Sequence, residues 1–394
     1  MKTWLADNRK RITEGLFYLA LTTELLLMIL EKSEISFHQE SHVFRVTFVL
    51  TLLAVLLMEH SKKEWIFIAA IWGFTFLCYY LSGKNDLLRV ATFLMAARDI
   101  DLKKAMKYSF FVSLSGFLLI VVLACAGVLG SVSDVADYGR RVGEEVRYSF
   151  GFGHPNSLFS AMYVLVLMWI WIYGSKAGII PYAVMSAVSV LVAVLSKSRT
   201  GLAVLALTLA AAVICRIFPK LSGVRALYYL EMLFSPVLCA LSAVAAAGIS
   251  EYVYLVKGPQ EVDGRFWTLE IALNFRISSI FYEAKDRDAV LGQWKLFAGR
   301  GADSYFDMGW VRIFYWYGIL PAILILIAIA AVVYMCKKER DIWTLILVFS
   351  LSLYTIVEAT FVTRYIGREF FLLIAGVYLG YYFTKKGDTD VRTA

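Results

Sequence analysis

Apolar runs recur along the whole chain, each about as long as the 17–25 residues that a helix needs to cross the hydrocarbon core of a bilayer. Of the 394 residues, 60% are hydrophobic, and the mean hydropathy is +0.68. A soluble fold has too little interior for so much apolar side chain, because its surface must carry far more charge. The sequence therefore predicts an all-α, polytopic membrane protein built as a single transmembrane domain, 1–394.

The pattern predicts about twelve spans, of which the fourth is short, weakly apolar and either steeply tilted or re-entrant. The predicted spans cover 15–30, 43–58, 64–81, 86–97, 107–130, 157–173, 178–195, 199–216, 229–250, 309–335, 341–359 and 367–383. A hydrophilic insertion, 251–308, separates the ninth span from the tenth. Within it, apolar residues at helical spacing over 264–276 predict an amphipathic helix on the membrane surface or over a cavity. Residues 1–13 are too polar for a cleavable signal peptide.

Lysine and arginine in short loops set the orientation of a membrane protein. Compact basic loops, SKK at 61–63 and CKKER at 336–340, favour a cytoplasmic location for both termini. The cations that then fall outside are mostly arginines, whose rigid fork of donors matches phosphate and carboxylate oxygens in pairs. We therefore predict an anion held at the outer face. Pairing of these arginines with acidic residues of their own loops is the alternative.

Other sites are disfavoured by the sequence. The five cysteines lie in or beside apolar runs without a CxxC pair, which predicts small buried hydrophobes and neither a disulfide nor a metal site. No cluster of closely spaced acids on the predicted outer side would hold a divalent metal. The long loop has mixed charges and no recognition motif for nucleic acid. Glu24 and Arg45 are expected to pair across the first hairpin, and the role of Glu358 stays open.

Cations gather near span ends at four places on the predicted outer side. The segments are RYSFGFGHPN at 147–156, SKSRTG at 196–201, the long loop with Arg265 and Arg300, and TRYIGRE at 363–369. In the first segment, glycines allow positive φ and His-Pro-Asn reads as a turn into a helix. A lone arginine at a span end is usually an interfacial anchor. Four such turns on one side favour a shared anion site.

In this order, the segments resemble those of oligosaccharide repeat-unit polymerases and O-antigen ligases. The similarity includes the His-Pro-Asn turn, the Ser-x-Ser-Arg-x-Gly hairpin, GR at 264–265, FAGRG at 297–301, DMGW at 307–310 and YGI at 317–319. It covers roughly 140–370, and FGFGHPN is most similar to capsule and exopolysaccharide polymerases of Gram-positive bacteria. The resemblance implies an enzyme of the bacterial cytoplasmic membrane whose active site faces outward.

That resemblance implies transfer of a glycan from an undecaprenyl diphosphate carrier to an acceptor hydroxyl, with inversion at the anomeric carbon. No metal ion or other cofactor is implied, because arginines stabilise the diphosphate leaving group. The implied partners are the undecaprenyl-diphosphate-linked oligosaccharide, the lipid bilayer, and a chain-length regulator and a flippase of the same pathway. By resemblance and predicted side, the diphosphate-binding residues are Arg147, Arg199 and Arg265, followed by Arg364 and Arg368.

The remaining candidates position the substrate or move a proton. His154 orients a phosphate or accepts a proton, and Asn156 and Ser198 are positioning residues; capping a helix is the structural alternative for His154 and Asn156. The loop histidine proposed as the base of O-antigen ligases is absent from 251–308. Its absence favours the polymerase, and it leaves Asp307, ahead of Asp303, as the candidate base.

Two further alternatives stay open. His38 and His42 of the first outer loop are other potential bases. A flippase or other transporter of lipid-linked oligosaccharide is the rival class, since twelve spans with both ends inside suit one. The short linker after the sixth span and the lack of visible repeated halves argue against it. A ligase that transfers the glycan to another acceptor is the nearer alternative.

Overall fold

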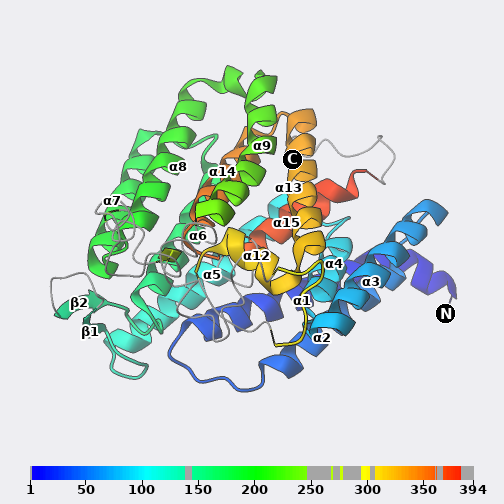
Figure 1. Cartoon of the computed structure of the whole chain (residues 1–394), viewed down its shortest axis with the longest axis horizontal. Helices are drawn as coiled ribbons and strands as arrows, with labels where there is room; N and C mark the ends of the chain where they lie inside the picture. Colours follow the sequence, from blue (N-terminus) through cyan, green and yellow to red (C-terminus); the bar gives the residue numbers. More distant parts are fainter. Residues whose placement is uncertain are drawn as a thin grey trace.

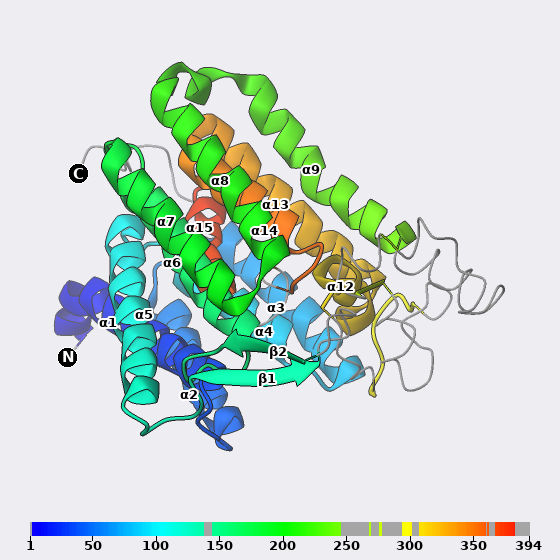
Figure 2. The ribbon, with the colours of Figure 1, turned by 90° about the vertical axis from the view of Figure 1, so that its left-hand side faces the viewer.

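A computed structural model describes residues 2–137, 144–245, 268, 276–277, 294–301, 307–359, 361 and 367–382. The regular secondary structure of these residues is helical apart from one two-stranded sheet, as Figures 1 and 2 show. Nine of the described helices are long and apolar enough to cross a bilayer. The prediction of a helical, multi-pass membrane protein is therefore confirmed.

The long helices are α1 (Lys2–Lys32), α2 (Glu40–Leu57), α3 (Lys62–Ser82), α5 (Leu102–Cys125), α6 (Pro155–Tyr173), α7 (Ile179–Ser196), α8 (Arg199–Ile217), α9 (Arg225–Ala243) and α13 (Ile319–Glu339). Four shorter helices complete the described bundle: α4 (Asp86–Ala96), α12 (Gly309–Tyr317), α14 (Ile342–Tyr354) and α15 (Arg368–Gly380). A helix of 13 residues such as α14 measures about 20 Å, short of a bilayer core of about 30 Å. Twelve full-length spans therefore remain a prediction.

The predicted fourth span, α4, has only 11 residues. It nevertheless returns the chain to the place where α3 begins, since Nη1 of Arg98 lies 2.6 Å from Oε1 of Glu64 in the first turn of α3. The same guanidinium lies 2.9 Å from Nδ1 of His60 and donates to the backbone oxygen of Glu59, between α2 and α3. This return favours a crossing over a re-entrant segment.

Two glycines on α15 let it pack closely beside α4. An added Cβ at Gly376 would lie 2.6 Å from Cβ of Ala97, and one at Gly380 would lie 2.4 Å from Cγ of Arg98. Small residues four positions apart are a common device for close approach of membrane helices. Both helices therefore end near Arg98, and we call this part of the bundle the Arg98 end.

The tenth predicted span, 309–335, is wrong in one respect, because it is two helices separated at Gly318. The φ of Gly318 is 99°, in the region that favours glycine. The segment 295–298 runs along the break, where Ile319 N–H donates to the backbone oxygen of Lys295. These bonds satisfy backbone groups that the interrupted helix leaves open. A hydropathy pattern misses the break because the residues on both sides of it are apolar.

A β-hairpin between α5 and α6 was not predicted from the sequence. Strand β1 (Ser133–Asp137) pairs antiparallel with β2 (Glu144–Tyr148), which places Asp134 opposite Arg147. The hairpin lies beside the end of α7, with which β2 is in contact (Figure 2). We call the part of the bundle that contains this hairpin, the end of α1 and the start of α6 the His154 end.

The cysteine prediction holds only in part. All five are free, and Cys78, Cys239 and Cys336 are buried. Cys125 is exposed and Cys215 is half-buried, so their predicted burial was wrong. In a membrane bundle an apolar position need not face protein, because lipid can cover it.

Candidate functional site

Strand β2 turns two of its charged side chains toward the protein and its two apolar or aromatic ones away from it. Along β2, Glu145 and Arg147 are 6% and 2% exposed, whereas Val146 and Tyr148 point outward. Residues two apart on a strand share a face, so this pattern is the reverse of an ordinary half-buried strand. Burial of charge is costly, which makes the inner face of the hairpin a candidate functional surface.

A tight turn then carries the chain from β2 to His154. Phe150 and Gly151 both have positive φ, at 46° and 77°. A Cβ at Gly151 would lie 2.9 Å from Cβ of Ala124, so glycine is required there for space as well as for conformation. Phe152, 1% exposed, forms a β-bridge with Ser33 just after α1. These contacts fix the position from which His154 starts α6.

His154 is the N-cap of α6, and this cap determines its tautomer. The backbone N–H of Asn156 donates to Nδ1 of His154 over 3.1 Å. The neutral ring then carries its proton on Nε2, which makes that atom a donor rather than an acceptor. Partial desolvation of the ring, followed by the positive charge of Arg147, lowers the pKa of His154 below its ordinary value, despite opposing contributions from Asp307 and Asp134. His154 therefore does cap the helix, through Nδ1.

The predicted hairpin 196–201 meets the first turn of α6. Ser198 Oγ donates to Oδ1 of Asn156 over 3.1 Å. Gly201 makes this approach possible, because a Cβ there would lie 2.3 Å from Cε1 of Phe159 on α6. Two separate sequence motifs are thus joined by side-chain contact at the His154 end.

Glu145 links the segment 196–201, between α7 and α8, to strand β2. Its Oε2 lies 3.6 Å from Nε of Arg147 and 3.5 Å from Nζ of Lys197. Lys197 adopts a left-handed conformation, with φ of 55°, at the end of α7. A single buried carboxylate therefore holds two cations that come from different predicted segments.

On the other side of His154, Arg276 lies between two carboxylates. Its Nη2 is 3.5 Å from Oδ2 of Asp307 and forms an ion pair with Glu358, and its Nε donates to the backbone oxygen of Val357. Burial opposes the charge of Arg276, but the two carboxylates outweigh it and its pKa lies above the ordinary value. The Asp307 side chain is 39% exposed, whereas Arg276 and Glu358 are buried.

These residues form one group, which we call the His154 cluster. Electrostatic contributions of Arg147, Asp307 and Arg276 to His154 tie its two halves together. Its members are Glu145, Arg147, His154, Asn156, Lys197, Ser198, Arg276, Asp307 and Glu358. The cluster contains a buried arginine, a histidine donor and a solvent-accessible carboxylate, which are the groups that an anionic leaving group and an acceptor hydroxyl require.

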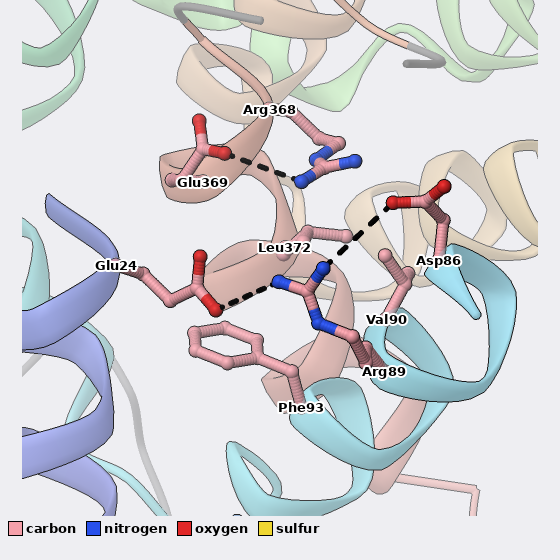
Figure 3. A pocket seen from close by; sticks show the side chains of 8 residues that line it. All are labelled: Glu24, Asp86, Arg89, Val90, Phe93, Arg368, Glu369 and Leu372. Carbon is pink, nitrogen blue, oxygen red and sulfur yellow. Dashed lines mark hydrogen bonds and ion pairs between the residues drawn. The ribbon is translucent and has the colours of Figure 1, made fainter. Parts of the chain in front are cut away.

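The other predicted site residues are placed less favourably or lie elsewhere. Arg199 is exposed at the first position of α8, next to Ser198. Arg368 starts α15 and lines a separate pocket with Arg89 on α4 and Glu24 on α1 (Figure 3). Some predictions lie outside the described residues, namely those on Arg265, Arg364 and Asp303. The same holds for the predicted amphipathic helix over 264–276, of which only 268 and 276 are described.

Pairing of Glu24 with Arg45 was wrong. Oε1 of Glu24 accepts from Thr47 Oγ1 at 2.7 Å and lies 3.1 Å from Nη2 of Arg89. Arg45 is exposed on α2. The sequence also missed Glu145, Lys197 and Arg276 as site residues. A signal existed only for Lys197, which stands inside the SKSRTG motif.

No family model, curated protein or solved structure matches the chain. Among the described residues, no group of three or more histidine, cysteine or acidic side chains is arranged to hold a metal ion. The chemistry of the His154 cluster therefore has to be inferred from its own geometry and from the motifs that it brings together.

Proposed function

We propose that the chain is a polysaccharide polymerase of the bacterial cytoplasmic membrane, acting at its outer face on undecaprenyl-diphosphate-linked repeat units. The single observation that carries this proposal is the hydrogen bond from Ser198 to Asn156. It brings the His-Pro-Asn turn and the Ser-x-Ser-Arg-x-Gly hairpin to one place, beside the arginine, histidine and carboxylate that the reaction needs.

In the proposed reaction, the acceptor hydroxyl of one repeat unit attacks the anomeric carbon of the growing chain. The bond from that carbon to the phosphate oxygen breaks, and its electron pair leaves with the diphosphate. Attack from the opposite face inverts the anomeric centre. Negative charge grows on the leaving oxygen, so donors fixed near it lower the barrier.

Arg147 and Arg199 are the proposed diphosphate ligands among the described residues. Arg147 is buried and held by Glu145, and Glu145 keeps a second partner in Lys197 when Arg147 turns toward a phosphate. Arg199 is exposed and adjacent to Ser198, and among the described residues it has no ion pair to break when it reaches a ligand. Nε2–H of His154 donates a further hydrogen bond to a phosphate oxygen.

Asp307 is the proposed base. Its carboxylate is more exposed than that of Glu358, the other acidic group beside Arg276, and its Oδ2 lies 3.5 Å from Nη2 of Arg276. The acceptor proton passes to Asp307 as the new glycosidic bond forms, so a strongly basic group is unnecessary. With Nδ1 of His154 engaged by the helix cap, the carboxylate suits this role better than the imidazole does.

Reconstitution of the purified chain with lipid-linked repeat unit tests the proposal. Products longer than one unit are expected from the wild type, and Arg147→Gln and Asp307→Asn should reduce their initial rate of formation about 10²–10³-fold. Arg225→Gln, an exposed arginine at the start of α9, is the matched control. Unchanged single units, with a control polymerase active in the same membranes, would reject the proposal. Movement of the unit between leaflets without elongation would identify a flippase, and transfer to a different acceptor would identify a ligase.

A further inference from the structure

A second buried group of charges lies between α1, α4 and α15 (Figure 3). We call it the Arg368 pocket, and it is lined by Glu24, Asp86, Arg89, Val90, Phe93, Arg368, Glu369 and Leu372. The close packing of Gly376 and Gly380 on α4 sets its position. Leu372 and Arg368 stand one and two turns before Gly376, and the start of α4 runs beside them.

Most of the charges in this pocket are already paired. Arg89 lies 3.1 Å from Glu24 and 3.9 Å from Asp86, and Nη2 of Arg368 lies 3.4 Å from Oε1 of Glu369. The side chain of Arg368 is 7% exposed, yet its Nε and Nη1 have no hydrogen-bond partner among the described residues. Buried guanidinium donors without acceptors are costly, so these atoms point to a ligand that supplies oxygen acceptors.

The balance of charge selects the class of ligand. Three carboxylates and two guanidinium groups line the pocket, which leaves one negative charge in excess. A diphosphate would add negative charge to a site that already carries it, and a metal cation would give Arg368 no acceptor. A hydroxyl group both accepts and donates, so it can satisfy Arg368 and a carboxylate together. Phe93 and Leu372 complete the lining, so a hydroxyl group that reaches Arg368 would lie beside apolar side chains.

We infer that the Arg368 pocket binds neutral sugar hydroxyls of the glycan and not its diphosphate. Arg368, which the family resemblance implied as a diphosphate ligand, then binds the sugar instead. The identity of the glycan as a lipid-linked repeat unit rests on the proposed function, whereas the preference for hydroxyl groups over anions rests on the pocket alone.

The test is a binding measurement on the full chain in lipid nanodiscs. The probes are the repeat-unit oligosaccharide, released from its lipid carrier, and inorganic pyrophosphate, each titrated by calorimetry. Arg368→Gln should weaken oligosaccharide binding roughly tenfold or more, since a hydrogen bond to a charged donor is lost. Pyrophosphate affinity should be unchanged. Arg45→Gln, which removes an exposed arginine on α2, should alter neither value.

A second variant keeps every charge in place. Leu372→Trp should fill the pocket and weaken oligosaccharide binding without changing pyrophosphate affinity. Absence of oligosaccharide binding by the wild type, or unchanged oligosaccharide affinity in folded Leu372→Trp or Arg368→Gln protein, would overturn the inference. Loss of pyrophosphate affinity in Arg368→Gln would also overturn it, since the pocket would then be an anion site.

The binding and elongation assays separate the two proposals. Suppose that oligosaccharide binding depends on Arg368 but the chain does not elongate lipid-linked units. This result would support sugar binding in the Arg368 pocket and reject polymerase activity. If the chain elongates lipid-linked units but its oligosaccharide affinity is unchanged in the Arg368 and Leu372 variants, the result would support polymerase activity and reject sugar binding in the Arg368 pocket.

Discussion

The hydroxyl of Ser198 donates to the amide oxygen of Asn156 over 3.1 Å, and this bond joins the turn between α7 and α8 to the first turn of α6. The backbone N–H of the same residue, Asn156, donates to Nδ1 of His154, the N-cap of α6. Asn156 therefore holds the turn between α7 and α8 through its side-chain oxygen and holds His154 through its backbone N–H. Movement of either contact shifts the geometry of the other.

A double-mutant cycle tests the coupling of Ser198 and Asn156. Ser198→Ala and Asn156→Ala should each lower the initial rate of elongation about tenfold, and the double variant should be little worse, because both changes remove one bond. Ser222→Ala, which loses a hydroxyl from the 3₁₀ turn Pro219–Gly223, should have the wild-type rate. Additive losses in the double variant would show that the bond does not position the site.

The close approach of α8 to α6 depends on Gly201. In Gly201→Ala the new Cβ would lie 2.3 Å from the ring of Phe159, so the helices must separate, at a cost of about 1–3 kcal/mol in the free energy of unfolding. Gly73→Ala on α3 is the matched control, since a Cβ there meets nothing within 4 Å, and helix propensity should stabilise it by up to about 1 kcal/mol. Thermal unfolding in detergent measures both. An equal Tm for the two variants would contradict the packing argument.

The segments that come together in the fold are easier to predict from the sequence than the side chains that form pairs. Arginine-bearing turns at span ends led to the segments of His154, Asn156 and Ser198, because hydropathy locates span ends and charge bias assigns them to a side. Asp307 was chosen because the loop 251–308 lacks a histidine. Partners such as Arg276 and Glu358 are 82 positions apart, and nothing local distinguishes Arg276 from other loop arginines.

Local geometry explains the remaining misses. Strand β2 carries Glu145 and Arg147 inward and Val146 and Tyr148 outward, so its alternation does not resemble that of an ordinary half-buried strand. The helix break at Gly318 depends on the segment 295–298, which lies close in space and has no counterpart in the apolar pattern. Glu24 was assigned to Arg45 on the next predicted span, whereas α4 brings Arg89 to it.

The ion pair of Arg276 with Glu358 should govern stability at the His154 end. Arg276→Gln leaves Glu358 buried without its cation, which should cost about 3–5 kcal/mol in the free energy of unfolding. Glu358→Gln in the same chain removes that buried charge and should recover much of the loss. Chemical denaturation of the four proteins in the cycle measures the coupling. If the second substitution gives no recovery, Glu358 is not the group that depends on Arg276.

The lowered pKa of His154 predicts an acid-sensitive site. Partial desolvation and the charge of Arg147 favour the neutral ring in the folded chain, so its folded pKa lies below the ordinary value of about 6.5. Between these two values the unfolded chain binds more protons than the folded one. The stabilising contribution of His154 is therefore complete above about pH 6.5 and is lost as the pH falls through the folded pKa. Protonation also places a hydrogen on Nδ1, which removes the acceptor of the Asn156 N–H.

The rate of elongation should therefore fall on the acidic side, with a midpoint below pH 6.5. His154→Asn keeps a capping oxygen and does not titrate, so its Tm should depend less on pH between about 5 and 6.5 than that of the wild type. Arg147→Gln removes the neighbouring cation and should move the His154 midpoint upward, as measured by the ring-proton NMR shift that is absent from His154→Asn. A midpoint at or above 6.5 in the wild type would contradict the environment described for His154.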